Sequence, residues 1–194
     1  MTRFLTILCA LAMLVGSAVA QVQTWNIDPN HTAAQFSVRH MGISTVRGAF
    51  TKVSGTAQYD PSNPSKTSVD ATIEAASVDT RVSMRDDDLR SDHYFDVAKY
   101  PTITFKSKSV EAAGAGKLKI TGDLTIHGTT KQVVLDVDGP SAAANDPRGN
   151  AHVGASASTT IKRTDFGVGG ANPMVGDDIT ITIDVELVRP AAAK

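Results

Sequence analysis

Apolar and polar side chains alternate along most of the chain, a pattern typical of strands that bury one face. The clearest case is 179–187, where every second residue is Ile, Val or Leu and the residues between them are Thr, Asp or Glu. Residues 117–126 also place apolar residues at alternate positions, and the pattern resumes at Val133 after the turn residues His127 and Gly128. These two runs predict an antiparallel hairpin.

Turn-forming residues divide the remaining alternating sequence into further strands. Clusters of Asp, Pro, Ser, Asn and Gly at 60–64 and 146–149 mark two of the divisions. The additional strands are predicted at 33–41, 46–59, 68–78, 102–110 and 150–161, with a short one at 24–27. The pattern therefore predicts an all-β domain of about eight antiparallel strands.

One segment, 81–97, interrupts the alternation. It is densely charged, and Val82, Arg85 and Leu89 recur at helical spacing. We expect one or two helical turns there, ending before Pro101, because the residue that precedes a proline is disfavoured in a helix. Acidic residues and arginines at the segment's ends suit a capped short helix, and the alternative function is a lid over one end of a barrel.

Eight antiparallel strands can bury one apolar face in two ways, as a sandwich or as a closed barrel. A barrel of this size is either filled by side chains or holds one small or elongated ligand. Small residues recur among the positions predicted to face inward, which favours an open lumen over a filled core. These residues are Ala34, Ala71, Ala75, Gly122, Gly154 and Ala157.

The first twenty residues have the pattern of a cleaved secretory signal peptide. Arg3 precedes an apolar run at 4–15, and the small residues at 18–20 form a cleavage site. The run is about twelve residues long, too short to span the roughly 30 Å hydrocarbon core of a bilayer. We expect export, loss of Cys9 with the leader, a single domain at 21–194 and no stable membrane anchor.

Charge and cysteine usage exclude several functions. The chain has 19 Lys and Arg against 20 Asp and Glu, with no basic cluster, so no nucleic-acid partner is expected. Cys9 is the only cysteine, so the mature chain would have no thiol nucleophile, disulfide or thiolate metal ligand. The sequence also has no G-x-S-x-G motif. We therefore predict that the protein is not an enzyme.

The five histidines show no short-spaced pair of the kind that binds metals in sequence motifs. No metal and no cofactor are therefore expected. His31 and His40 are nine residues apart and could act together only if the fold brought them close. A metalloenzyme dependent on these two histidines is the third and weakest hypothesis, while His127 and His152 are interpreted as surface residues.

Five blocks of sequence, in order along the chain, resemble the YceI family. The first begins Phe36-Ser37-Val38-Arg39-His40 and continues to Phe50. The others are Arg85 to Asp96, Tyr100-Pro101-Thr102-Ile103-Thr104-Phe105, Gly122 to Lys131 with Ile126-His127-Gly128 at its centre, and Arg163-Thr164-Asp165-Phe166-Gly167. Together they extend the resemblance over roughly residues 24–189.

The resemblance implies an eight-stranded antiparallel lipocalin-like barrel with a short helical lid segment, located in the periplasm. Its apolar tunnel would hold a long isoprenoid or fatty-acyl-like chain without covalent chemistry. The ligand classes are an isoprenoid quinone, a prenyl phosphate or a fatty-acyl-type lipid, and homodimerisation stays open. The alternative is a stress-related periplasmic interaction module with a filled barrel and no lipid ligand, so a continuous interior cavity would discriminate between the two.

Two groups of candidate ligand-binding residues follow from the inward-facing positions and the matching blocks. The candidates for the tunnel lining are Phe36, Val38, Phe50, Ile73, Phe105, Ile126 and Phe166. The candidates for the rim or for head-group contact are His31, Arg39, His40, Arg47 and Arg85. Arg163 is a further arginine that could pair with an anionic head group, because a guanidinium binds phosphate and carboxylate through two parallel hydrogen bonds.

Overall fold

The computed structural model describes residues 22–60 and 63–191, so the predicted signal peptide lies outside the described residues. These residues form one antiparallel sheet, one α-helix and three short 3-10 helices. The strands are β1 (Gln23–Ile27), β2 (Ala33–His40), β3 (Ser44–Phe50), β4 (Val53–Tyr59), β5 (Ser68–Glu74), β6 (Val78–Asp79), β7 (Thr102–Ala112), β8 (Lys117–Ile126), β9 (Thr129–Asp138), β10 (Ala144–Asn145), β11 (Ala151–Lys162) and β12 (Val175–Arg189). The helix α1 is Ser83–Arg90, and the 3-10 helices are η1 (Pro64–Lys66), η2 (Ala75–Ser77) and η3 (Arg163–Phe166).

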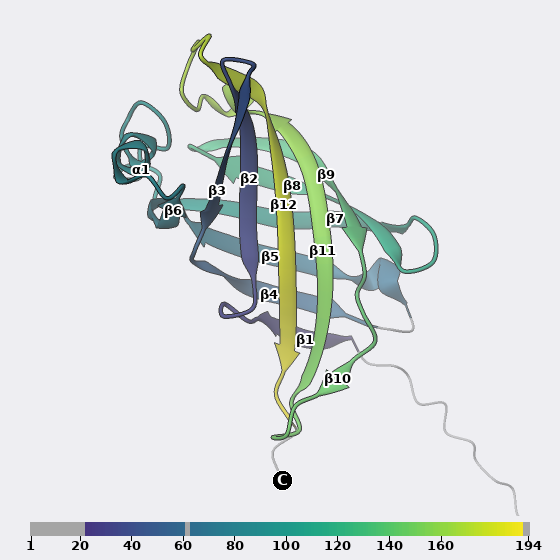
Figure 1. Ribbon diagram of the computed structural model, residues 1–194. Helices are drawn as coiled ribbons and strands as arrows, with labels where there is room; N and C mark the ends of the chain where they lie inside the picture. Colours follow the sequence, from purple (N-terminus) through teal and green to yellow (C-terminus); the bar gives the residue numbers. More distant parts are fainter. Residues whose placement is uncertain (1–21, 61–62, 192–194) are drawn as a thin grey trace, which may run out of the picture.

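Eight of the strands close into an antiparallel barrel. They pair in the order β11-β9-β8-β7-β5-β4-β1-β12, and the pairing of β12 with β11 closes the ring (Figure 1). The predicted hairpin is the β8–β9 pair, whose register runs without interruption from Lys117↔Asp138 to Ile126↔Thr129. Closure leaves no open edge between these eight strands and directs one face of each toward a common interior.

The remaining long strands, β2 and β3, form a hairpin that extends the wall beside β12. One edge of β12 pairs first with β2, between Val175 and Asp184, and then with β1 at Leu187 and Val188. Because β12 changes its partner between Asp184 and Leu187, the barrel wall divides there into a β2–β3 part and a β1–β4 part. In Figure 1, the strands β2, β11 and β12 in front cross β4, β5 and β7 behind them at a steep angle.

The prediction of one strand over 46–59 was wrong, because the chain breaks between β3 and β4 at Thr51 and Lys52. The amide of Thr51 donates to the carbonyl of Ser77 (3.1 Å), and the carbonyl of Lys52 accepts from the amide of Glu74 (3.1 Å). The break lets β3 follow β2 and β4 follow β1. The alternation changes phase at this break, from apolar residues at even positions up to Phe50 to apolar residues at odd positions from Val53. The shift marks the break in the local pattern but does not show which strand each part pairs with.

The charged segment 81–97 contains α1, as predicted, and the three aspartates of its acidic run differ in burial. Asp86 is buried, and its carboxylate accepts from the amide of Thr80 (2.8 Å) and from the Thr80 hydroxyl (2.5 Å). Asp87 and Asp88 are exposed. Arg90, in the last turn, donates to the carbonyl oxygens of Ala76 (2.9 Å) and Val78 (2.8 Å). These bonds attach the helix to the β5–β6 connection.

Apolar side chains in α1 and just after it close the barrel end beneath the helix. Leu89, Tyr94 and Phe95 pack against the main core cluster. The ring of Phe95 meets the ring of Phe50 edge-on, with 5.6 Å between centroids. The segment therefore forms the predicted helical lid, because it covers the end of the barrel where β3 ends.

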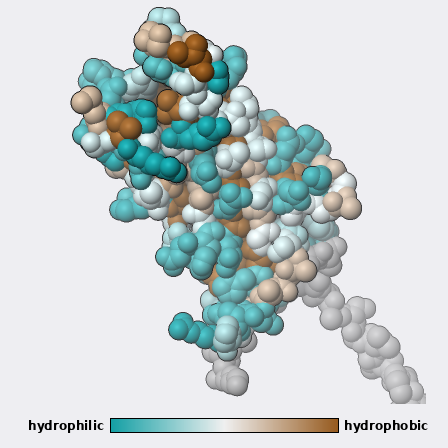
Figure 2. All heavy atoms as spheres, viewed as in Figure 1, coloured by the Kyte–Doolittle hydropathy of each residue, from teal (hydrophilic) through white to brown (hydrophobic). Residues whose placement is uncertain are grey.

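On the face drawn in Figure 2, polar residues predominate, and apolar residues gather at a tip where the β2–β3 turn meets the residues before β12. Ile43, Met41 and Met174 at this tip are 77%, 51% and 46% exposed, and the amide of Met41 donates to the Met174 carbonyl (2.8 Å). Within 22–60 and 63–191, no helix combines the length and the apolar character needed to cross a bilayer.

Candidate ligand-binding cavity

A cavity of about 270 Å³ runs inside the barrel and is walled by residues of every strand of the ring. Ligand sites in proteins are typically about 300–1,000 Å³, mostly apolar, with a few polar groups. The lining here is almost entirely aliphatic and aromatic. The barrel is therefore neither a sandwich core nor a fully packed barrel, and its interior suits an apolar ligand.

Strict alternation along two strands builds much of this wall. On β12 the residues at odd positions from Ile179 to Leu187 face the cavity, whereas Thr180 and Thr182 face outward. On β8 both Leu118 and Ile126 line the cavity. These two residues are eight positions apart on one strand, so the cavity extends about 27 Å along it.

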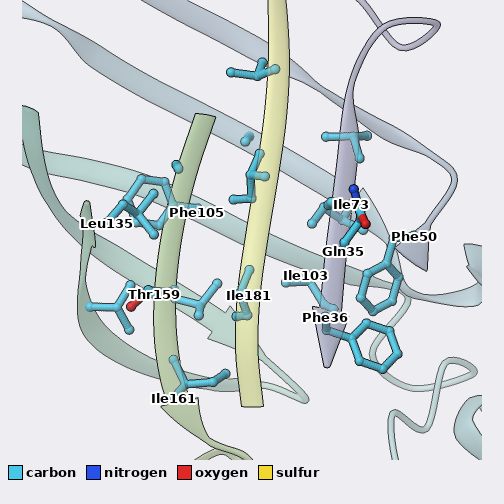
Figure 3. Close-up of a pocket in the computed structure, with 18 of the residues that line it drawn as sticks. Gln35, Phe36, Phe50, Ile73, Ile103, Phe105, Leu135, Thr159, Ile161 and Ile181 are labelled. Atoms are coloured by element: carbon cyan, nitrogen blue, oxygen red, sulfur yellow. The ribbon is translucent and has the colours of Figure 1, made fainter. Parts of the chain in front are cut away.

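All seven residues predicted for the tunnel lining lie on the cavity wall, and Figure 3 shows several of them pointing into it. They come from β2, β3, β5, β7, β8 and η3, and they are Phe36, Val38, Phe50, Ile73, Phe105, Ile126 and Phe166. Their placement agrees with the alternation in the sequence, which predicted that these side chains face the interior. Their contact with a ligand stays a prediction.

The five residues predicted for the rim do not line the cavity. His31 is in the loop between β1 and β2, on the outside of the wall, and is 64% exposed at its side chain. Arg47 is exposed on β3, and His40 ends β2. Because all of β2 separates His31 from His40, the fold does not bring these two histidines together. The hypothesis of a metalloenzyme built on that pair is therefore unsupported.

The other two predicted rim arginines bond to the chain close to them. Arg39 donates to the hydroxyl of Thr45 (2.8 Å) and to the carbonyl of Gly42 (2.6 Å), which fastens the β2–β3 turn. Arg85 donates to the hydroxyl of Thr80 (2.7 Å) and to its carbonyl (2.9 Å). Contact of either residue with a head group would require these bonds to change.

Arg163 is the arginine that reaches the cavity wall, and it is only 6% exposed. A guanidinium has five N–H donors. In Arg163 all five point at backbone carbonyl oxygens within 3.3 Å. The acceptors are Val168, Gly170, Asn172, Val175 and Gly176. Its donors are therefore used to fix the chain between η3 and β12, and the sequence-based interpretation of Arg163 as a head-group contact does not fit this geometry.

Polar side chains on the wall are few, and two of them lie at the end away from the lid. Tyr59 ends β4, whereas the lid lies near the start of that strand. Burial raises the pKa of the Tyr59 hydroxyl and the nearby charge of Asp60 raises it further, so the group stays neutral at ordinary pH. The hydroxyl of Thr67, also on the wall, is buried without a hydrogen-bond partner among the described residues. These hydroxyls could bond a polar group of a ligand, and the sequence contained no signal for them.

Glycine at position 122 sets the shape of the wall near Phe105. A Cβ atom at Gly122 would lie 2.5 Å from the Phe105 ring and 2.7 Å from the carbonyl oxygen of Lys106. The absence of a side chain at Gly122 thus gives the Phe105 ring its space. At Gly154, on β11, the nearest atom to such a Cβ would be the Val185 carbonyl oxygen at 3.8 Å, which leaves room.

We expect Gly122→Ala to destabilise the protein by about 1–3 kcal/mol, because the new methyl group must displace both a ring and backbone. Urea unfolding curves of the two proteins measure the change. Gly154→Ala is the matched control on another barrel strand, and it should not lower stability. Equal midpoints for Gly122→Ala and the parent protein would contradict the packing of Phe105 over this glycine.

Comparison with known proteins identifies relatives over nearly the whole described chain. The family model described as YceI-like domain matches residues 25–187. A UPF0312 protein of Pectobacterium atrosepticum is 38% identical over 184 residues, covering 94% of this chain and 95% of the relative. The match to the family model extends from the middle of β1 to near the end of β12.

Solved structures share the architecture. The crystal structure of Burkholderia cenocepacia BcnA is 27% identical, with a TM-score of 0.74, and the match covers 82% of this chain and 98% of that one. A polyisoprenoid binding domain from Saccharophagus degradans, implicated in plant cell wall breakdown, is 17% identical with a TM-score of 0.63, covering 88% and 100%. At that identity the second likeness shows a common fold alone.

Proposed function

The chain belongs to the YceI-like domain family, and from this premise we propose that it is a periplasmic lipid-binding protein. It sequesters or carries a long-chain isoprenoid or a similar amphiphile, such as a quinone, a prenyl phosphate or a fatty-acyl lipid, inside the barrel. The observation behind this proposal is the elongated apolar cavity, which extends from the lid residues to Tyr59 and Thr67 at the far end. The lipid-binding role also draws on the Saccharophagus domain, which is described as polyisoprenoid binding.

Transfer of the apolar chain out of water provides the free energy of binding. Each buried methylene group contributes about 0.8 kcal/mol, so a long hydrocarbon chain would gain far more from this wall than a short one. The wall gives little discrimination along the chain, because one methylene more or less in an apolar slot changes affinity by only about 1–3 kcal/mol. Selection of the head group falls to the few polar side chains, Tyr59 and Thr67 among them.

Location in the periplasm is proposed from the signal-peptide pattern at 1–20. A hydrophobic ligand that crosses an aqueous compartment needs a shield from water, and a closed barrel with an apolar interior provides one. The alternative of an interaction module with a filled barrel loses its distinguishing feature, because the barrel contains a cavity lined by apolar side chains.

We expect a bound lipid to accompany the protein when it is purified from its native host without detergent. Native mass spectrometry should show a species heavier than the bare polypeptide. Organic extraction of the same sample should then release a prenyl or acyl lipid in near-stoichiometric amount and identify its head group. A mass equal to the bare polypeptide, together with no uptake of added quinone or prenyl lipid, would overturn the proposal.

A further inference from the structure

A second group of functional side chains lies on the outside of the barrel, where the edge of β12 passes from β2 to β1. Asp28 and His31 come from the loop between β1 and β2, Glu186 from β12, and His152 from β11. The register of β11 against β12 places Gly154 opposite Glu186, so His152 is a diagonal neighbour of Glu186 on the outer face. Sequence spacing contained no hint of this group, because its members are up to 158 positions apart.

The donor atoms of these side chains form a continuous chain of short contacts. Nδ1 of His31 lies 2.8 Å from Oδ2 of Asp28 and 4.0 Å from Oε1 of Glu186. The same Glu186 oxygen lies 2.7 Å from Nδ1 of His152. One ligand atom each from Asp28, His31 and Glu186 are all within 4.8 Å of one another.

We propose that Asp28, His31, His152 and Glu186 form a binding site for a divalent transition-metal ion such as Zn²⁺. Two imidazole nitrogens and two carboxylates form a donor set suited to zinc, nickel or copper, and the imidazoles separate it from the all-oxygen ligand sets that calcium prefers. Donor atoms around tetrahedral zinc at 2.0–2.1 Å are about 3.4 Å apart. The donor atoms of Asp28, His31 and Glu186 lie within 4.8 Å of one another, so small side-chain rotations bring these three to one centre. His152 would join them by rotating from the Glu186 oxygen that its Nδ1 already contacts at 2.7 Å.

The orientation of the His152 ring suits a metal ligand, because its two nitrogens face different carboxylates, Nδ1 that of Glu186 and Nε2 that of Asp146. Its Nε2 atom is buried without a hydrogen-bond partner among the described residues, and it faces Oδ2 of Asp146 at 3.5 Å. With Nδ1 on a metal, the ring proton resides on Nε2 and is directed at that carboxylate. Histidine ligands are commonly oriented by a carboxylate in this way, so Asp146 is a positioning residue. Asp146 is itself fixed by the amide nitrogen (2.8 Å) of the Asn150 side chain.

Charge and access also suit a cation. Three carboxylates, Asp28, Asp146 and Glu186, surround two imidazoles, so a divalent ion would offset most of the local negative charge. His31 is 64% exposed and opens the site to solvent, whereas Asp28 is only 15% exposed. A bound ion would link the β1–β2 loop to β11 and β12 and so strengthen the wall where it divides. This inference does not depend on what the barrel cavity holds.

The test is metal binding by the untagged protein after EDTA treatment and dialysis. Isothermal titration with ZnCl₂ should show one ion per chain, and Co²⁺ should give the visible absorption of a tetrahedral site. Zinc at a hundredfold excess over Kd should raise the Tm by about 5–10 °C, since only the folded chain brings the ligands together. His31→Ala and His152→Ala should abolish the site, and Asp146→Asn should weaken it about 10–100-fold.

His93→Ala is the matched control. His93 forms a similar exposed pair with Asp88, 3.0 Å apart, and a second carboxylate, Asp92, lies 4.0 Å away, but all three come from one segment. Zinc binding that His93→Ala leaves unchanged and His31→Ala removes supports the proposal. His31 is exposed, so its replacement leaves the fold intact and its result is decisive. No zinc uptake by the parent protein, or uptake unaffected by His31→Ala, overturns the proposal.

Discussion

Phe105→Asp is expected to weaken binding of a long apolar chain by at least about 100-fold. Phe105 is buried on β7 and lies on the cavity wall, so the new carboxylate would either displace the ligand with its hydration or be desolvated without a partner. A desolvation cost of about 3 kcal/mol already corresponds to that factor in affinity. Titration of the delipidated protein with a fluorescent prenyl lipid measures the change.

Two further substitutions separate loss of the binding surface from loss of the fold. Phe105→Leu keeps the wall apolar and should retain binding. Ala157→Phe, on β11, adds a ring at the cavity wall and should reduce ligand capacity without introducing any polar group. Circular dichroism reports whether each variant is folded. Folded Phe105→Asp and Ala157→Phe proteins that still bind the lipid as tightly as the parent would show that the ligand does not occupy this cavity.

Arg163→Met is expected to reduce the free energy of unfolding by about 3–5 kcal/mol. Methionine fills a similar volume but donates no hydrogen bond, so five backbone carbonyls between Val168 and Gly176 would lose their donor. Buried acceptors left without a partner cost about 1–3 kcal/mol each, and part of that cost is recovered by rearrangement of the chain. A loss of this size lowers the Tm by about 6–20 °C in a domain of this length.

Arg47→Met is the control for Arg163→Met, because Arg47 is exposed on the outer face of β3. Its replacement should change stability by no more than about 0.5 kcal/mol. Arg163→Lys is a second informative variant, since one ammonium group has three donors and lacks the planar geometry of guanidinium. It should recover only part of the stability. A loss below about 1 kcal/mol for Arg163→Met would contradict the role assigned to these bonds.

Most strand positions, and the direction in which their side chains face, were predictable from the sequence. The alternation over 179–187 predicted which face of β12 is apolar, and those residues line the cavity. The β8–β9 hairpin was confirmed for the same reason. In a strand, successive side chains point to opposite faces, so two neighbouring residues already determine which of them faces inward. The face to which a strand side chain points is therefore encoded in the residues next to it.

Properties that depend on distant partners were not predictable. The apolar positions over 46–59 change from even to odd numbers at Thr51 and Lys52, which marks a break, but this shift does not tell which strands β3 and β4 pair with. The guanidinium of Arg163 was equally ambiguous, since five backbone acceptors and one phosphate satisfy it in similar ways. Only the folded loop before β12 shows that its donors are already occupied.

The sequence by itself determined the chemistry of the two faces of the barrel wall, apolar inside and polar outside, and located the charged segment that forms the lid. The tertiary structure alone decided that the eight strands close around a cavity, that His31 lies beside Glu186 rather than beside His40, and that His152 joins them. The physical reason is that successive side chains along one strand alternate between its two faces, so the sequence of that strand alone shows which residues share a face. Closure and side-chain encounters instead depend on the register between strands that are more than a hundred residues apart.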